Sequence, residues 1–372
     1  MSQDSLKARA EELLEHADVR INGERPTDIK VHDEQLYSRV FAHGTLGMGE
    51  SYMDGWWDAE DLPGFFTRIL RAHLDEKLKT LGTLVAHLKA KYINEQRGKH
   101  AFEIGRAHYD TGNDLFVKML GKYLMYSCGY YAEADNLDDS QEAKLDLLCR
   151  KLQLKPGQKV LDIGCGWGEA LKFAAERYGV EGVGVTVSEE QAKFARELCK
   201  GLPIEIRLQD YHDLDETFDA IYSIGMFEHV GARNYRTYFE IVRRCLKQDG
   251  LSVLHCCGSN ATPAQPDPWI EKYIFPNSVI PSASQVTKAL ENLFVVEDWH
   301  NFSADYDRTL MAWIANFDAA WPELKADYDE RFRRMWHFYL ACSAAIFRSR
   351  RDQLWQITLS PNGVPGGYRV PR

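Results

Sequence analysis

Three alternating glycines near the middle of the chain are the first residues whose type and spacing suggest chemistry. They end the apolar run Val160-Leu-Asp-Ile-Gly-Cys-Gly-Trp-Gly168, and a helical pattern begins at the next residue, Glu169. A buried strand that turns into a helix through glycines brings its backbone close to a bound ligand. The spacing is too tight for G-x-G-x-x-G, so a dinucleotide pyrophosphate is not the expected ligand. Taken alone, the pattern also fits a tight turn without a ligand.

Titratable residues stand at the ends of two later strand patterns. Glu228 and His229 lie in Gly225-Met-Phe-Glu-His-Val-Gly231, and His255 lies near the end of the apolar run Leu251–Cys256. Because ligands of open parallel sheets bind at the carboxyl ends of the strands, we expect these groups at one site. A carboxylate there can hold a charged group or move a proton. Two simpler roles stay open: Glu228 as an acid in the first turn of a helix, and His255 as a hydrogen-bonded core residue.

Polar residues also follow the second and third strand patterns. The second ends at Thr186, where nucleotide-binding folds of this type usually carry an acid that holds ribose hydroxyls. Ser188 and Gln191, at the start of the next helix pattern, therefore have to supply the polar contacts. The third ends in Gln209-Asp210-Tyr211, where an acid beside an aromatic ring can hydrogen-bond to an adenine and flank it.

These residues must be positioned by an alternation of strand and helix patterns. The helical patterns Ser188–Lys200 and Tyr235–Leu246 are among those that separate the strands. Such an alternation predicts an α/β fold with a doubly wound, Rossmann-like parallel sheet and helical insertions. Strands are expected at Lys159–Ile163, Gly182–Val187, Ile204–Leu208, Ala220–Ser223 and Leu251–Cys256.

The pattern along the chain predicts three parts. These are a small N-terminal domain (1–75), a basic helical linker (76–105) and a catalytic domain (106–372), whose tail from Pro281 adds further helices. In the first part, the segment that ends in Trp56-Trp57 is rich in glycine and aromatic residues. It either packs around two core tryptophans or presents aromatic side chains to a membrane interface or a second subunit.

Composition limits the class of protein. The 372 residues can bury a full core, and the net charge of −10 argues against nucleic acid as the main partner. No apolar run approaches the ~20 residues that span a bilayer, and the polar N-terminus is not a secretory signal. The eight cysteines include no C-x-x-C pair, which favours a reducing compartment and predicts no metal site. We therefore expect a cytoplasmic protein.

Basic residues are concentrated in three places despite the acidic net charge. They lie between Lys77 and Arg106, in Arg331-Phe-Arg-Arg334, and in Arg348-Ser-Arg-Arg351. Such runs are often solvated helix faces. They could also form a surface that meets anionic lipid headgroups.

Several motifs together resemble the cyclopropane-fatty-acyl-phospholipid synthases and the related mycolic acid synthases, a family of S-adenosylmethionine-dependent methyltransferases. The glycine loop alone occurs in many methyltransferases, whereas its combination with Glu-His-Val-Gly and a late tyrosine motif is narrow. The resemblance spans essentially the whole chain. It is carried by the segments Gly47–Trp57, His108–Phe116, Tyr126-Ser-Cys-Gly-Tyr-Tyr131, Val160–Gly168, Gly225–Gly231, Asp298-Trp-His300 and Asn301-Phe-Ser-Ala-Asp-Tyr306.

The resemblance implies that a methylene group passes from S-adenosylmethionine to the cis double bond of an unsaturated acyl chain in a membrane phospholipid. An alkene is a poor nucleophile, so the methyl donor has to be held against it in a dry apolar channel. A methyl-branched or methylene product is the alternative outcome on the same scaffold. Contacts to the methyl donor are expected from Tyr126, Ser127, Asp162, Gly164, Gly166, Gly168, Thr186, Ser188, Gln191, Gln209, Asp210 and Tyr211.

The resemblance also implies a base, thought to be a bound bicarbonate ion, that removes a proton from the transferred methyl group. Tyr306 and His255 can donate hydrogen bonds to this anion, and Glu228 can accept one. From the residues alone, Cys128 would be a small buried thiol. The implied catalytic set is Cys128, Glu228, His255 and Tyr306, and the backbone near Cys257 completes the bicarbonate contacts. The intact set argues against a lipid-binding protein without catalysis.

Three further expectations follow from the resemblance. Some members of the family carry a late catalytic cysteine, and here Cys342 and Ser343 share that region. The mechanism needs no nucleophilic thiol, so Cys342 is expected to be structural. A homodimer is implied, together with transient peripheral association with the inner face of the membrane.

Overall fold

The structure, a computed structural model, describes residues 2–74, 113–262 and 266–372. The chain divides into two compact units. The first unit takes residues 1–93, 264–276 and 306–352, and the second takes residues 94–263, 277–305 and 353–372. The expected linker (76–105) and the first basic cluster, Lys77 to Arg106, lie outside the described residues.

The first unit is mainly helical and draws on three separate stretches of the chain, whereas the sequence predicted a domain of residues 1–75 alone. Helix α3 packs against α15, and α2 packs against α1, α12 and α15. Strands β1 and β2, which flank α2 in the sequence, pair as a two-stranded antiparallel sheet. The described elements are α1 (Gln3–Glu15), β1 (Lys30–Val31), α2 (Gln35–Met53), β2 (Trp57–Asp58), α3 (Leu62–Arg71), α12 (Pro268–Tyr273), α14 (Ala304–Leu324) and α15 (Glu330–Arg348).

Trp57 forms part of the core of the first unit. Its side chain is fully buried, and its ring lies 5.0 Å from that of Tyr52 and 5.3 Å from that of Phe65, centroid to centroid. Trp56 is only half-buried, and the Arg39 guanidinium lies 4.7 Å from its ring centroid. Trp57 is therefore a core tryptophan, and its side chain is not exposed for contact with a membrane.

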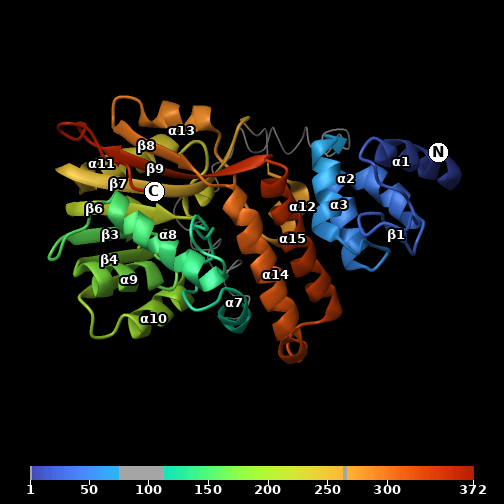
Figure 1. Ribbon diagram of the computed structural model, residues 1–372, viewed down its shortest axis with the longest axis horizontal. Helices are drawn as coiled ribbons and strands as arrows, with labels where there is room; N and C mark the ends of the chain where they lie inside the picture. Colours follow the sequence, from blue (N-terminus) through green and yellow to red (C-terminus); the bar gives the residue numbers. More distant parts are fainter. Residues whose placement is uncertain (1, 75–112, 263–265) are drawn as a thin grey trace. The chain divides into compact units, whose positions relative to one another are not determined.

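The second unit contains the sheet (Figure 1). Seven strands follow the order β5-β4-β3-β6-β7-β9-β8. The pairs β3–β4, β3–β6, β4–β5 and β6–β7 are parallel, as the strand–helix alternation predicted, and β8–β9 is antiparallel. The strands are β3 (Lys159–Ile163), β4 (Glu181–Thr186), β5 (Ile204–Leu208), β6 (Phe218–Ile224), β7 (Leu246–Ser259), β8 (Val295–Asn301) and β9 (Asp352–Ser360).

Helices cover both faces of this sheet, and the residues of β3 alternate between two cores. Val160 packs with residues of α8, α9 and α10, whereas Leu161 packs with residues of α11 and α13 (Figure 1). This alternation is the period of two that a strand imposes on its side chains. The helices are α7 (Asn113–Met119), α8 (Leu137–Lys151), α9 (Glu169–Tyr178), α10 (Glu189–Leu198), α11 (Tyr235–Cys245) and α13 (Ala283–Leu290), with short 3-10 turns η1 (Tyr211–Asp213) and η2 (Phe227–His229).

The two basic clusters that the structure describes are largely paired within the first unit. Arg331 and Arg334 contact the carboxylates of Asp54 and Asp58, and Arg348 makes two hydrogen bonds to Asp307. Carboxylates that neutralise these guanidinium groups weaken the interpretation as a lipid-headgroup surface. Among the helices of the described residues, none is long and apolar enough to cross a membrane.

Candidate active site

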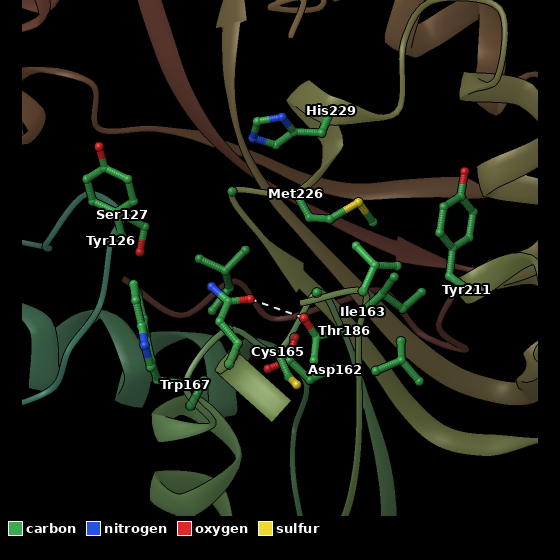
Figure 2. Close-up of a pocket in the computed structure, with 18 of the residues that line it drawn as sticks. Tyr126, Ser127, Asp162, Ile163, Cys165, Trp167, Thr186, Tyr211, Met226 and His229 are labelled. Carbon is green, nitrogen blue, oxygen red and sulfur yellow. Dashed lines mark hydrogen bonds between the residues drawn. The ribbon is translucent and has the colours of Figure 1, made fainter. Parts of the chain in front are cut away.

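A cavity of about 190 Å³ opens at the carboxyl ends of β3, β4 and β6, where parallel sheets bind their ligands (Figure 2). Its lining includes most of the residues that were predicted to contact the methyl donor. These are Tyr126, Ser127, Asp162, Gly164, Gly166, Thr186, Gln191, Gln209, Asp210 and Tyr211.

The glycine loop turns sharply between β3 and α9. Gly164 has a φ of +86° and Gly166 a φ of +53°, in the left-handed region that side chains disfavour. A Cβ on Gly164 would also lie 2.8 Å or less from the side chain of Met226, whereas a Cβ on Gly166 would meet nothing within 4 Å. Gly166 therefore leaves space in the cavity that a ligand can fill.

Two predicted contacts shape the cavity without lining it. Gly168, at φ +90°, starts α9, and a Cβ there would lie 3.0 Å from Ala195 on the neighbouring helix α10. The Ser188 hydroxyl caps α10 by accepting a hydrogen bond from the backbone N–H of Gln191 at 3.3 Å. Gly168 thus packs between α9 and α10, and Ser188 starts the helix that brings Gln191 to the cavity, but neither residue lines the cavity.

The end of β4 supplies two linked polar groups in place of an acid. The Thr186 hydroxyl donates to Oε1 of Gln191 over 3.1 Å and accepts from the backbone N–H of Ser188 over 3.2 Å (Figure 2). The amide nitrogen of Gln191 stays available for a ligand oxygen. The sequence-based expectation that Gln191 replaces the missing acid agrees with this arrangement.

The end of β5 brings Asp210 and Tyr211 to the same cavity. Asp210 accepts hydrogen bonds from the backbone N–H and the ring of His212, at 3.0 and 2.7 Å. These bonds hold the carboxylate in place. The Tyr211 ring lies 4.1 Å from that of His212 and 5.7 Å from that of Tyr238, and Tyr211 lines the cavity, where a flat ligand group can pack against an aromatic side chain.

Among the lining residues, Trp167 and Met226 were not predicted, whereas His229 was expected at this strand end and lines the cavity. Trp167 lies within the glycine loop, and its ring lies 5.2 Å from that of Phe116, which also packs at 5.2 Å against Tyr126. Burial lowers the pKa of His229 to about 4, so this imidazole is neutral. An aromatic residue between two glycines was the available signal for Trp167, whereas Met226 required knowledge of how the loop after β6 folds.

Asp162, at the end of β3, is a buried acid in the wall of the cavity. Burial raises its pKa to about 8, because no solvent stabilises the carboxylate. A cationic group bound in the cavity would favour the ionised form. An ammonium or sulfonium ligand therefore fits this end of the site.

A second polar group lies beside the cavity, at the ends of β6 and β7. Glu228 follows β6, and its Oε1 accepts a hydrogen bond of 2.6 Å from the backbone N–H of Cys257. Its Oε2 is buried without a hydrogen-bond partner in the described structure, and burial raises the pKa of the carboxyl group. Glu228 is thus more than a helix-start acid, because its second oxygen is held ready for a ligand.

His255 has a matching open position. Gln356 of β9 donates from Nε2 to the His255 Nδ1 over 3.3 Å. Burial and the charges of Lys144 and Lys151 lower the pKa of His255, so the ring is neutral and its proton resides on Nε2. This Nε2–H is buried without a partner among the described residues. The site therefore offers one open donor and one open acceptor.

Cys128 and Tyr306 complete the predicted set. Cys128 is fully buried directly after Ser127 of the cavity wall, and its thiol contacts the Gly129 carbonyl at 3.1 Å. Tyr306 belongs to the first unit, where its ring packs 4.5 Å from that of Phe347. The contact of Tyr306 with the other three residues stays a prediction.

Aromatic rings lie next to His255. The ring of Phe302 lies 5.9 Å from His255, 4.9 Å from His300 and 5.3 Å from Tyr130. The faces of such rings attract positive charge. This wall can therefore stabilise a cation that develops close to the open donor and acceptor.

The parallel sheet, the glycine turn and a strand-end cavity with an acid define a Rossmann-like S-adenosylmethionine-dependent methyltransferase, an enzyme. The family model described as mycolic acid cyclopropane synthetase matches residues 96–357. The chain belongs to this family.

Relatives and solved structures agree with this assignment. The chain is 51% identical over 370 residues to the cyclopropane-fatty-acyl-phospholipid synthase of Escherichia coli (strain K12), covering 98% of this chain and 95% of that protein. The structure of the cyclopropane synthase MmaA2 from Mycobacterium tuberculosis is similar with a TM-score of 0.66 and 30% identity, over 69% of this chain and 97% of that one. Mycolic acid cyclopropane synthase CmaA1, solved with SAH and CTAB, gives a TM-score of 0.65 and 32% identity, over 69% and 97% of the two chains.

Proposed function

We propose that this protein is a cyclopropane-fatty-acyl-phospholipid synthase, which adds a methylene group to the cis double bond of an unsaturated acyl chain in a membrane phospholipid. S-adenosylmethionine supplies the methyl group. The π electrons of the alkene form the new carbon–carbon bond while the carbon–sulfur bond breaks. Loss of a proton from the new methyl group then lets the resulting carbocation close to a ring.

Different residues of the chain have different roles in this reaction. Gly164, Gly166 and Trp167 shape the cavity for the donor, and Asp162 faces its cationic amino-acid end. The rings around Phe302 stabilise the carbocation. The low exposure of these groups excludes water, which would otherwise capture the cation as an alcohol.

Bicarbonate fits the open positions of the second polar group and would supply the base. His255 Nε2–H can donate to an anion oxygen, and Glu228 Oε2 can accept from the bicarbonate hydroxyl. With its raised pKa, Glu228 would instead donate when it carries a proton. In this proposal Tyr306 adds a donor, the Cys128 thiol turns from the Gly129 carbonyl to the anion, and the Cys257 backbone N–H acts by holding Glu228.

The choice of a phospholipid substrate depends on one observation, the extent of the match. The synthase of E. coli aligns with 98% of the chain, whereas the two cyclopropane synthase structures cover 69% of it. The family model starts at residue 96, so helices α2 and α3 of the first unit precede it, whereas the 98% match includes them. Handling of membrane lipid by this unit would account for that difference.

The assay uses purified full-length protein with S-adenosylmethionine and vesicles. Phospholipid with a cis-unsaturated chain should gain one methylene by mass spectrometry, and saturated phospholipid should gain nothing. Proton NMR then separates the ring, whose methylene protons lie far upfield, from a methyl-branched or methylene product. A vesicle lipid that remains unchanged while an acyl group on another carrier is modified would refute the phospholipid assignment.

The first unit is proposed to dock lipid, at the inner face of the membrane, and to hold the subunits of a homodimer. A cavity of about 340 Å³ in this unit is lined mainly by apolar side chains, including Phe41, Ile69 and Phe338, with Asp267, Arg351, Asp352 and Cys342 also in its wall. An acyl chain matches the apolar part of this lining. In this interpretation Cys342 is structural.

A further inference from the structure

Lys144 is a buried lysine that the mechanism above does not use. It lies in α8, its side chain has no solvent exposure, and its Nζ donates to the Ser127 hydroxyl oxygen over 2.8 Å. Lysine is almost never fully buried unless it is paired. Lys151, two turns further along the same helix, has the Asp298 carboxylate at 3.2 Å. Within the residues that the structure describes, no carboxylate lies within ion-pair distance of Lys144.

The hydrogen bond from Lys144 determines which way the Ser127 hydroxyl can donate. An ammonium group is only a donor, so it occupies a lone pair of the hydroxyl oxygen. Gln141, one turn earlier in α8, donates to the Ser127 carbonyl over 2.8 Å. Both polar ends of Ser127 are therefore held by α8. Ser127 lines the cavity (Figure 2), so its O–H can donate to a ligand bound there.

The charge behind Ser127 selects an anionic ligand group. Burial lowers the pKa of Lys144 to about 7 although Cys128 and Asp162 act in the opposite direction, and a bound anion would further favour the ammonium. Asp162, in the wall of the same cavity, suits a cation. S-adenosylmethionine carries a carboxylate and an ammonium on one carbon, and these two polar groups of the protein match that pair.

We propose that Lys144 is a positioning residue for the methyl donor, which orients the Ser127 hydroxyl onto the donor's carboxylate and supplies the positive charge behind it. The proposal depends on the cofactor in the proposed function. It adds that the amino-acid end is recognised as a zwitterion, by Lys144 and Ser127 at the carboxylate and by Asp162 at the ammonium. Fixing this end sets the direction of the sulfonium methyl group at the other end of the same short chain.

The test compares two ligands that differ at this end. S-adenosylhomocysteine has the amino-acid end, and 5′-methylthioadenosine lacks it. Calorimetry on the full-length protein should show that Lys144→Met weakens S-adenosylhomocysteine at least tenfold and changes methylthioadenosine less than twofold. Lys144→Arg, which keeps the charge, should recover part of the loss. Above about pH 7 Lys144 loses its proton while the Asp162 carboxyl ionises, so the affinity of the wild type for S-adenosylhomocysteine should fall relative to that of Lys144→Met, which keeps only the Asp162 titration.

Other results would overturn the proposal. Equal losses for both ligands would indicate a purely structural lysine. A rise in the bicarbonate concentration needed for turnover, with both affinities unchanged, would assign the charge to bicarbonate at Cys128 and His255. If Lys144→Met does not fold, Ser127→Ala removes the donor itself and should give the same selective loss. A wild type that binds neither ligand would refute the cofactor assignment, whereas normal binding with no product would refute only the proposed function.

Discussion

At the scale of single residues, the proposed reaction centre contains two buried groups that are each held by one neighbour and have one polar atom without a partner among the described residues. The backbone N–H of Cys257 holds Oε1 of Glu228, and Gln356 holds Nδ1 of His255. Leaving a buried polar atom without a partner is costly, so such atoms are expected where a ligand completes them. Lys144 was identified in a related way, as a buried charged group with no ion-pair partner among the described residues.

Glu228→Gln tests this reaction centre. Glutamine keeps the size and can still accept at one oxygen, but it cannot exchange a proton. We expect kcat to fall at least about 100-fold while the affinity for S-adenosylhomocysteine stays within about twofold. Steady-state kinetics and calorimetry measure the two quantities. Glu240→Gln, on the exposed surface of α11, is the matched control and should leave both unchanged.

Asp162→Asn tests the buried acid through the pH dependence of stability. The pKa of Asp162 is about 8 in the folded protein and 3.8 ordinarily, so between these values only the folded state keeps the proton. The stability that Asp162 contributes is therefore fully present at low pH and is lost as the pH rises toward 8. Thermal unfolding without ligand should show the wild type losing stability relative to Asp162→Asn over this range. Parallel pH curves would contradict the buried-acid interpretation.

Individual residues also show how much of the candidate site could be predicted from the sequence. Glu228 and His255 were found because a strand end is a strong positional signal. Lys144 was missed because it lies in the middle of a helix, where a lysine usually faces solvent. Its burial depends on Ser127, which is distant in sequence and meets α8 only in the folded chain.

At the scale of elements, the turn from β3 to α9 makes the cavity. Gly166→Ala would place a Cβ in space that no protein atom occupies. Gly201→Ala is the matched control, because Gly201 also has a positive φ and a Cβ built on it would meet no atom within 4 Å. Each change should lower the free energy of unfolding by about 1–2 kcal/mol. Only Gly166→Ala should weaken S-adenosylhomocysteine, more than tenfold by calorimetry. Equal affinities of the two variants would place the cofactor elsewhere.

The predicted parallel strands are confirmed, with ends that differ by a few residues. Strands β8 and β9 were not predicted, because only helices were expected after Pro281. Both faces of β9 are buried, yet it carries Gln353, Gln356 and Thr358 among its apolar residues. These buried polar residues interrupt the apolar run by which a central strand is recognised. One of them, Gln356, donates to His255, so the residue that holds this histidine also interrupts the apolar pattern of β9.

At the scale of the whole molecule, the limits of the two units could not be read from local patterns. The stretches 264–276 and 306–352 join the N-terminal residues in the first unit. Such an arrangement depends on contacts between distant parts of the chain, such as α3 with α15. The sequence predicted a separate N-terminal part but not the helices that return to it.

The proposed lipid-docking role belongs to this scale. Ile69→Glu places a charge in the apolar cavity of the first unit, and Leu208→Glu, at an exposed position of β5 in the second unit, is the control. The first change should lower activity on vesicles more than tenfold, because burying an unpaired carboxylate opposes acyl-chain binding. It should not change the affinity for S-adenosylhomocysteine. If both variants keep full activity, the cavity does not bind the lipid.

The central claim, that a carbocation formed by methyl transfer loses a proton from the new methyl group and closes to a ring, has one direct test. Full-length protein is incubated with cis-unsaturated phospholipid vesicles and S-adenosylmethionine that carries a fully deuterated methyl group. Mass spectrometry and deuterium NMR of the acyl chain should find a cyclopropane ring whose methylene carbon keeps two of the three deuterons. A methyl branch that keeps all three would contradict the account, because proton removal at Glu228 and His255 would then play no part.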